Sequence, residues 1–331
     1  MTSTSERQQG MTTHRAENAL WFFRRGLVLA CACALTVNPT FASRVAAQAA
    51  KQRTFGSPED AVKALIVTAK AGNLDQLLAI FGPDGRELIA SADPATARRN
   101  REVFTVAAGE QWHLEDAGPN RKTLIIGNED WPFGVPLVKE ASGWRFDTAA
   151  GKEEVLARRI GSNELAAIET SRAYVTAQRR YAQQGHGGKA AGVYAMKFHS
   201  DPGKENGLYW PVTKGQKRSP LGELVAQAAE EKRPIGGDRA QPSPFRGYYF
   251  RILTAQGAAA PGGAKSYVVN GDMSGGFALI AWPAEYGAQG IMTFLVNQDG
   301  IVFEKDLGGG TDATARKITS YNPDASWRQA Q

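Results

Sequence analysis

The residues best suited to ligand chemistry lie in the middle of the chain. His186 stands in a glycine-rich stretch, Gly185-His-Gly-Gly188, which could present an imidazole to a ligand. Tyr209 and Trp210 follow in a region rich in Pro, Gly and Lys, and aromatic rings offer rigid contact area to sugars and peptides. We therefore predict that His186, Tyr209 and Trp210 bind a ligand. A solvated loop histidine and aromatic rings packed in the core are the alternative interpretation.

The segment 297–300, Asn-Gln-Asp-Gly, invites comparison with a calcium-binding loop. With Gly300 at the sixth position of an EF-hand loop, Asp299 and Asn297 fall at ligand positions. Leu295 then falls at the first position, and it has no oxygen to offer. Asp-Gly between alternating apolar residues is typical of a β-hairpin. We predict a tight turn in which Asp299 is structural, and we predict no metal site.

Common catalytic motifs are missing from the sequence. Ser274 comes closest to a hydrolase nucleophile, but the glycine before it, Gly271, lies one residue too far away. The lysine in Gly187-Gly-Lys189 lacks the following Ser or Thr of a phosphate-binding loop, and the histidines lack the paired spacing of zinc sites. We predict no catalytic residue and no cofactor, and a triad built from distant residues stays open.

The first 42 residues are predicted to be a signal peptide. Arg24 and Arg25 precede about a dozen uncharged residues, a length typical of a signal peptide and too short to span a bilayer. Thr40 and Ala42 offer small residues at the positions that a signal peptidase reads. We expect cleavage near Ala42 and a periplasmic or secreted protein without a transmembrane anchor. The twin arginines leave the export route open, and Met11 leaves the start open.

The composition is that of a globular protein with a modest positive charge. The chain has 331 residues, of which 42% are hydrophobic and 22% charged, and a formal net charge of +6. It has no dense block of Lys and Arg, so nucleic-acid binding has little support. Both cysteines, Cys31 and Cys33, fall within the predicted signal peptide. The mature chain would therefore have no disulfide, thiolate metal site or cysteine nucleophile.

The pattern of residues 55–150 predicts helices followed by an antiparallel meander. Ser57 is placed to cap a helix that ends at Gly72, and Asn73 to cap a second helix that ends at Phe81. From residue 111 the apolar period changes from that of a helix to that of a strand. A third helix is predicted over 94–108, and strands over 112–114, 123–126, 135–138 and 143–146.

Residues 152–184 are predicted to form one long helix, which Gly161 and Ser162 could interrupt. Its apolar stripe must pack on a core. The stripe consists of residues spaced by seven and their neighbours: Ile160, Ala167, Ile168, Tyr174, Val175, Tyr181 and Ala182. After the helix, the pattern predicts a short helix over 221–231, strands over 247–254 and 276–282, and a hairpin over 290–304.

Five late segments carry a family resemblance. They are 247–254 (Gly-Tyr-Tyr-Phe-Arg-Ile-Leu-Thr), 281–287 (Ala-Trp-Pro-Ala-Glu-Tyr-Gly), 293–300 (Thr-Phe-Leu-Val-Asn-Gln-Asp-Gly), 304–308 (Glu-Lys-Asp-Leu-Gly) and 321–327 (Tyr-Asn-Pro-Asp-Ala-Ser-Trp). With these segments, residues 55–328 resemble an uncharacterised family of exported bacterial proteins defined by a domain of unknown function. The resemblance implies an envelope protein and carries no activity with it.

A second resemblance concerns the long helix and the late strands. The helix over 163–181, then Gly-Tyr-x-Phe, a proline turn and Gly-x-x-Thr-Phe-x-Val-x-x-Asp-Gly, is similar to the soluble part of some type IV pilin-like proteins. This resemblance implies a long helix packed on an antiparallel sheet. Residues 26–30, Gly-Leu-Val-Leu-Ala, lack the aromatic residue and the glutamate of a pilin processing site, so the resemblance extends to the domain shape alone.

These observations predict an α+β fold with two subdomains after the signal peptide, 1–42, and a flexible lead-in, 43–54. Helices and an antiparallel meander form the N-terminal subdomain, 55–150, and a pilin-like helix and sheet form the C-terminal subdomain, 151–331. We predict a non-catalytic binding or structural protein of the envelope, whose partner is an unknown envelope protein or a peptide or glycan ligand. The alternative is a periplasmic hydrolase acting on a peptide or glycan, with its site between the two halves.

Overall fold

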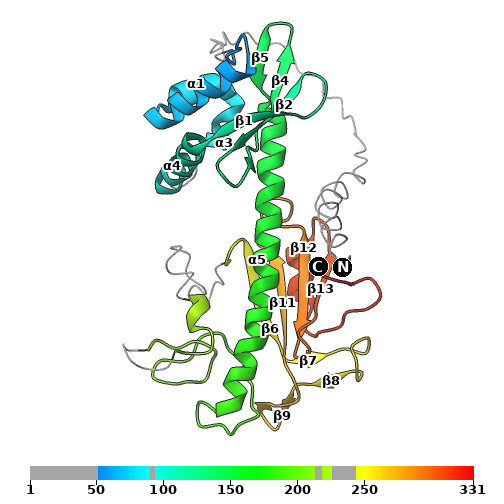
Figure 1. Cartoon of the computed structure of the whole chain (residues 1–331). Helices are drawn as coiled ribbons and strands as arrows, with labels where there is room; N and C mark the ends of the chain where they lie inside the picture. The colour runs from blue at the N-terminus through cyan, green and yellow to red at the C-terminus, as the bar shows by residue number, and fades with distance from the viewer. Residues whose placement is uncertain (1–50, 90–93, 213–217, 226–243) are drawn as a thin grey trace, which may run out of the picture. The chain divides into compact units, whose positions relative to one another are not determined.

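The fold combines helices with antiparallel sheets, which confirms the predicted α+β class (Figure 1). The computed structural model describes residues 51–89, 94–212, 218–225 and 244–331. The predicted signal peptide with its cleavage position near Ala42 lies outside the described residues, as does most of the predicted lead-in. The predicted helix over 221–231 is described only to residue 225, where residues 222–225 are helical.

The first helices begin and end where the capping residues predict. Ser57 Oγ accepts the Asp60 N–H at 3.1 Å, and Asn73 Oδ1 accepts the Gln76 N–H at 3.0 Å. Gly72 ends the first helix with a φ of +65°, a conformation that favours glycine. The helices are α1 (Pro58–Ala71), α2 (Leu74–Phe81), the 3-10 turn η2 (Pro83–Gly85), α3 (Arg86–Ile89) and α4 (Pro94–Glu110).

An antiparallel sheet follows these helices, as the change of period predicts. Its strands are β1 (Trp112–Asp116), β2 (Arg121–Ile126), β3 (Trp131–Pro132), β4 (Leu137–Glu140) and β5 (Gly143–Phe146), in the order β1-β2-β4-β5 with β3 beside β2. Helices α1, α2 and α4 contact this sheet. Side chains from both layers form one hydrophobic cluster, in which Val62, Leu124 and Phe146 are fully buried.

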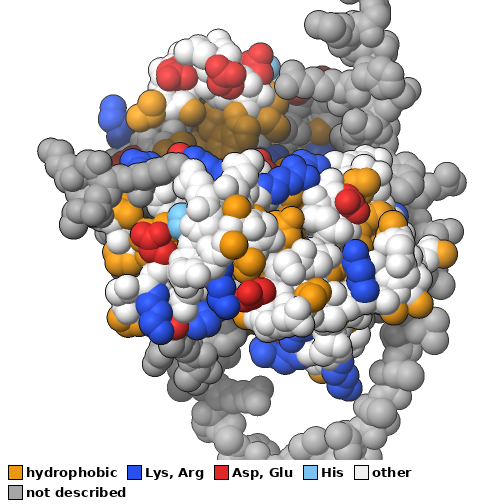
Figure 2. Space-filling model, turned by 90° about the horizontal axis from the view of Figure 1, so that it is seen from below, with side chains coloured by type: hydrophobic (Ala, Val, Ile, Leu, Met, Phe, Trp, Pro, Cys, Tyr) orange, Lys and Arg blue, Asp and Glu red, His pale blue; other side chains and the backbone are white. Residues whose placement is uncertain are grey.

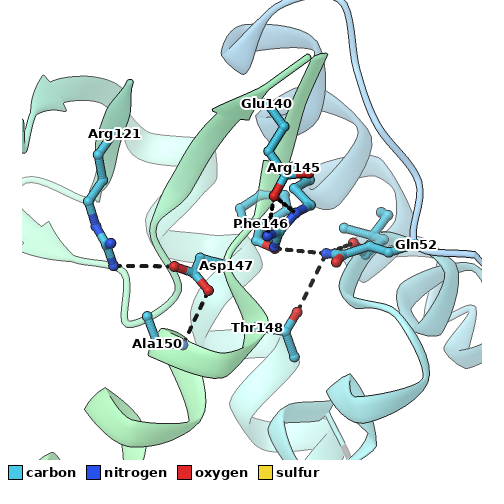
Figure 3. Close-up of polar contacts among 9 residues, drawn as sticks. Gln52, Arg121, Glu140, Arg145, Phe146, Asp147, Thr148 and Ala150 are labelled. Carbon is cyan, nitrogen blue, oxygen red and sulfur yellow. Dashed lines mark hydrogen bonds and ion pairs between the residues drawn. The ribbon is translucent and has the colours of Figure 1, made fainter. Parts of the chain in front are cut away.

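Helix α5 (Thr148–Gln184) begins four residues earlier than predicted and continues through Gly161 and Ser162. The reason is a cap that the prediction missed. Asp147 Oδ1 accepts the Ala150 N–H at 3.3 Å, and the other carboxylate oxygen of Asp147 lies 3.6 Å from Arg121 (Figure 3). Gln52 holds the same junction from outside the helix, because its amide donates to the Phe146 carbonyl at 2.8 Å (Figure 3).

The predicted stripe of α5 is buried from residue 166 onward. Tyr174 and Val175 are 1% and 3% exposed, and the Tyr174 hydroxyl donates to the Ala278 carbonyl at 3.1 Å. Ile160 is the exception, because it is half-buried and belongs to neither hydrophobic cluster. The buried stripe thus starts about two turns later than the heptad spacing predicts.

These strands form a second antiparallel sheet, in the order β14-β13-β12-β11-β6. The predicted strands are confirmed as β6 (Tyr248–Leu253), β11 (Ala278–Pro283), β12 (Met292–Asn297) and β13 (Val302–Asp306). The sequence pattern did not predict five two-residue strands, β7 (Ala255–Gln256), β8 (Lys265–Ser266), β9 (Val268–Val269), β10 (Asp272–Met273) and β14 (Arg328–Gln329), or helix α7 (Thr311–Lys317). Residues of α5, β6, β11 and β12 share a second hydrophobic cluster.

The turn predicted at 297–300 is confirmed. The Gly300 N–H donates to the Asn297 carbonyl at 3.0 Å, and Gly300 has a φ of +83°. Asp299 is structural here, since its carboxylate accepts the Asn297 side-chain amide at 2.9 Å and its N–H donates to Asn297 Oδ1 at 3.1 Å. The subdomain boundary at residue 150 and the likeness to pilin-like domains stay predictions.

Candidate functional site

The end of helix α5 leads into the glycine-rich loop that carries His186. Gly185 follows the helix with a φ of +63°. A Cβ on Gly185 would lie 2.6 Å from the Lys189 carbonyl oxygen, so any other residue would both strain the backbone and collide with the returning chain. Glycine is therefore needed for the sharp turn that brings His186 back beside the end of α5.

Gln178 holds the loop against α5 from within the core. Its side chain is fully buried, and it bonds both backbone groups of Ala195: Nε2 donates to the carbonyl at 2.8 Å, and Oε1 accepts the N–H at 2.9 Å. Nε2 also donates to the Tyr174 hydroxyl at 3.0 Å. Burial raises the pKa of Tyr174, which keeps this hydroxyl neutral as a donor to Ala278.

His186 lies between two aromatic rings. Its ring centroid is 4.9 Å from that of Tyr181 and 5.1 Å from that of Trp210. Its Nδ1 lies 3.0 Å from Glu205 Oε2, and the side chain is 13% exposed. The Tyr181 hydroxyl donates to the Glu205 carbonyl at 3.0 Å. His186 is therefore a positioned residue, and the interpretation of a solvated loop histidine does not fit these contacts.

A second loop brings Trp210 and Glu205 to His186. The Ser200 N–H donates to the Tyr209 carbonyl, and the Tyr209 N–H donates to the Phe198 carbonyl, both at 2.8 Å. At the far end of the loop, Asn206 Oδ1 accepts the Asp201 N–H at 2.9 Å. Backbone and side-chain bonds thus close residues 198–209 into a defined loop, which limits the entropy that a ligand would have to remove.

These elements surround a pocket of about 1010 Å³. This volume is at the upper end of the range that small-molecule sites usually show, about 300–1,000 Å³. Its wall includes the side chains of Arg180, His186, Lys204, Glu205, Trp210 and Arg218. The lining residues within the described part of the chain lie between residues 180 and 220, so these residues do not place the pocket between the two predicted halves.

The two carboxylates at the pocket wall both have cationic or histidine partners. Asp201 lies 2.9 Å from Lys197 Nζ, and Glu205 pairs with His186. By contrast, within the described part of the chain no carboxylate oxygen lies within 4 Å of the side-chain nitrogens of Arg180, Lys204 or Arg218, although all three are exposed at the pocket. The wall therefore has an excess of unpaired positive charge.

Positive charge is dispersed on one face of the molecule. On the face drawn in Figure 2, Lys and Arg side chains lie in separate places among apolar side chains.

The predicted site residues fall into two environments. His186 and Trp210 line the same pocket and contact each other. Both Tyr209 and Trp210 pack against the second hydrophobic cluster, but the Tyr209 ring lies 5.5 Å from the His199 ring and Tyr209 does not line the pocket. The reason is geometric: in extended backbone, consecutive side chains point to opposite sides. Arg180, Lys204, Glu205 and Arg218 are pocket residues that the sequence did not reveal.

Ser200 has the one hydroxyl among the described lining residues that could act as a nucleophile, and it takes part in a hydrogen bond within the loop. Ser200 Oγ accepts the Gly207 N–H at 2.9 Å, and His186 Nδ1 pairs with Glu205. Among the residues that the structure describes, no group of three or more His, Asp or Glu side chains is arranged to hold a metal ion. The arrangement is suited to holding a ligand by stacking, hydrogen bonds and charge.

Comparison with known proteins gives a family. The sequence profile of a family described as "Protein of unknown function (DUF2950)" matches residues 52–330. The chain belongs to the DUF2950 family. The DUF2950 match includes both hydrophobic clusters and the pocket. No curated protein and no solved structure matches the chain. In the described parts of this DUF2950 protein, no helix is both long enough and apolar enough to cross a membrane.

Proposed function

We propose that this DUF2950 protein is an exported envelope protein that binds a peptide or glycan ligand, without catalysis, in the pocket of His186 and Trp210. The observation that carries the proposal is that a histidine and a tryptophan 24 positions apart line one pocket and contact each other. A tryptophan face beside positioned polar groups is a common way to hold a sugar ring or a peptide.

The loop contacts support a preformed site. Gln178 and Gly185 set the path of the chain around His186, and the bonds between Ser200 and Tyr209 set the opposite wall. A site whose walls are already ordered loses less conformational entropy when a ligand binds. Such rigidity is expected of a binding pocket and has no evident use in a loop that only connects α5 to β6.

Calorimetric titration of the mature chain with N-acetylmuramyl dipeptide tests this function, because that probe contains both a sugar and a peptide. We expect saturable binding that Trp210→Ala weakens at least about tenfold, as the loss of a central aromatic contact does. Trp131→Ala is the matched control, because Trp131 is 49% exposed on β3, far along the chain from the pocket residues. Equal binding by both variants would contradict the proposed site.

A hydrolase acting on a peptide or glycan is the second candidate. The His186–Glu205 pair favours it, since a carboxylate beside an imidazole can orient a general base. The commitment of Ser200 Oγ to Gly207 favours binding instead. Mass spectrometry of the probe after incubation separates the two functions: hydrolysis products that His186→Gln abolishes would establish the second candidate, whereas unchanged probe supports binding alone.

Export is part of the proposal and rests on residues 1–42, whose pattern is that of a signal peptide. We expect the mature protein to begin near Ser43 and to be recovered from the periplasm or the medium. Mass spectrometry of the purified protein's N-terminus decides this. An intact N-terminal segment, or a lipid on Cys31 or Cys33, would contradict it.

A further inference from the structure

We propose that the ligand of this pocket carries a carboxylate group and that Arg180, Lys204 and Arg218 receive it. This inference rests on the proposed binding function and adds the chemical class of the ligand. It starts from an asymmetry at the pocket wall: both carboxylates there are paired, whereas the three cations have no carboxylate partner in the described part of the chain.

The existing ion pairs at the pocket wall determine which charge on a ligand the pocket favours. A cationic group would have to compete with Lys197 for Asp201 or with His186 for Glu205, and it would be repelled by Arg180, Lys204 and Arg218. An anionic group finds partners that need not give up an existing bond. A guanidinium can also bind a carboxylate with two parallel hydrogen bonds, which gives orientation as well as attraction.

Part of the remaining wall is apolar, and this limits the shape of the ligand. Trp210, Pro211 and Val212 are consecutive lining residues, and Pro202 and Pro220 add to them. Trp210 is half-buried against His186, so one ring face is supported while the residue still lines the pocket. A small acid with a sugar ring or an apolar side chain next to its carboxylate would use both parts of this wall.

The position of the cations in the chain makes the proposal more specific. Arg180 comes from α5, Lys204 from the loop that closes over 198–209, and Arg218 from the segment beyond Trp210. Three separate segments therefore bring positive charge to one pocket. Neighbouring lysines on one exposed loop would be close together in any conformation and would not indicate a ligand. These three cations meet only because the chain folds in this way.

Two matched pairs of probes test the inference by NMR titration of the mature chain. N-acetylmuramic acid and N-acetylglucosamine are sugars with and without a carboxylate, and acetyl-Ala-Ala and its C-terminal amide are peptides with and without one. We expect the acid of at least one pair to shift the Trp210 indole signal saturably and to bind at least about fivefold more tightly than its neutral partner at low salt. The pair that responds identifies the source of the carboxylate.

Charge variants make the test specific to the pocket. Arg180→Gln should reduce the preference for the acid by about threefold or more, and raised salt should reduce it further. Arg172→Gln is the matched control, because Arg172 is an exposed residue of α5 that does not line the pocket. It should leave the preference unchanged.

The outcomes separate this inference from the proposed function. If acid and neutral probes bind equally and Arg180→Gln has no effect, the carboxylate inference is wrong while the binding function stands. If no probe shifts the Trp210 signal, both are contradicted. An acid preference that Arg172→Gln reduces as much as Arg180→Gln would show that general surface charge, and not the pocket, attracts the acid.

Discussion

Gln178 is the residue whose replacement tests the architecture of the site most severely. It bonds both backbone groups of Ala195 and the Tyr174 hydroxyl, with no exposed surface of its own. Gln178→Met keeps nearly the same side-chain volume and leaves no large cavity. It removes all three bonds, so its effect on stability reports the polar contacts alone.

The magnitude follows from the groups left without partners. The N–H and C=O of Ala195, a residue 2% exposed, would both lose their bonds to Gln178. A buried polar group without a partner costs about 1–3 kcal/mol, so the two together set a range of about 2–6 kcal/mol. Access of water as the loop loosens lowers this cost, and we expect a loss of about 3 kcal/mol in the free energy of unfolding.

Urea denaturation followed by circular dichroism measures the loss, and hydrogen exchange at the Ala195 amide shows whether it is local. We expect faster exchange at Ala195 and weaker binding of N-acetylmuramyl dipeptide, because the loop carries His186. Gln76→Met is the control: Gln76 is exposed on α2, and the same change there should cost under about 0.5 kcal/mol. Equal losses at Gln178 and Gln76 would refute the role assigned to Gln178.

Other predictions concern the core, the hairpin and the pH dependence of stability. Val175→Ala should cost about 1–3 kcal/mol through lost burial and a cavity, and Arg172→Ala under about 0.5 kcal/mol, as denaturation midpoints will show. Gly300→Val should cost about 1 kcal/mol or more, because a β-branched residue is strained at a φ of +83°, while added calcium should leave the melting temperature unchanged. Burial raises the pKa of Glu164 above the ordinary 4.5, although the N–H of Met292 bonds its carboxylate and opposes the shift. Just above pH 4.5 the folded state therefore retains a proton that the unfolded state has lost, so the contribution of Glu164 to stability falls as pH rises from about 4.5 through the raised pKa of the folded state. Urea denaturation at several pH values should show Glu164→Gln gaining stability relative to the parent as pH rises through this range. A parallel pH dependence in parent and variant would contradict this assignment.

Local signals predicted much of the fold because they act through neighbouring residues. The caps at Ser57 and Asn73 and the turn at Gly300 are short-range hydrogen-bond and φ requirements, and the structure contains all three. The start of α5 was predicted too late, because the local cap at Asp147 was missed and because the contacts of Gln52 and Arg121 at this junction come from distant parts of the chain. Such distant partners leave no periodic trace in the sequence.

The site was partly predictable for the same reason. Glycines around His186 and the adjacent pair Tyr209-Trp210 are visible in the sequence, and His186 and Trp210 do meet at one pocket. The pairing of His186 with Glu205 and the position of Arg180 at the same pocket depend on how two loops pack against α5. Ile160 was predicted to be buried because it fits the heptad spacing, but it is only half-buried, since it lies before the point where α5 reaches the second cluster.

The central claim is that the pocket of His186 and Trp210 binds a ligand, and fluorine NMR of the chain labelled with 5-fluorotryptophan tests it most directly. Trp210→Phe assigns the Trp210 signal, and the signal of the exposed Trp131 serves as the internal control. Titration with N-acetylmuramyl dipeptide should shift the Trp210 signal saturably and leave that of Trp131 in place. An unmoved Trp210 signal, or equal shifts at both residues, would contradict the claim.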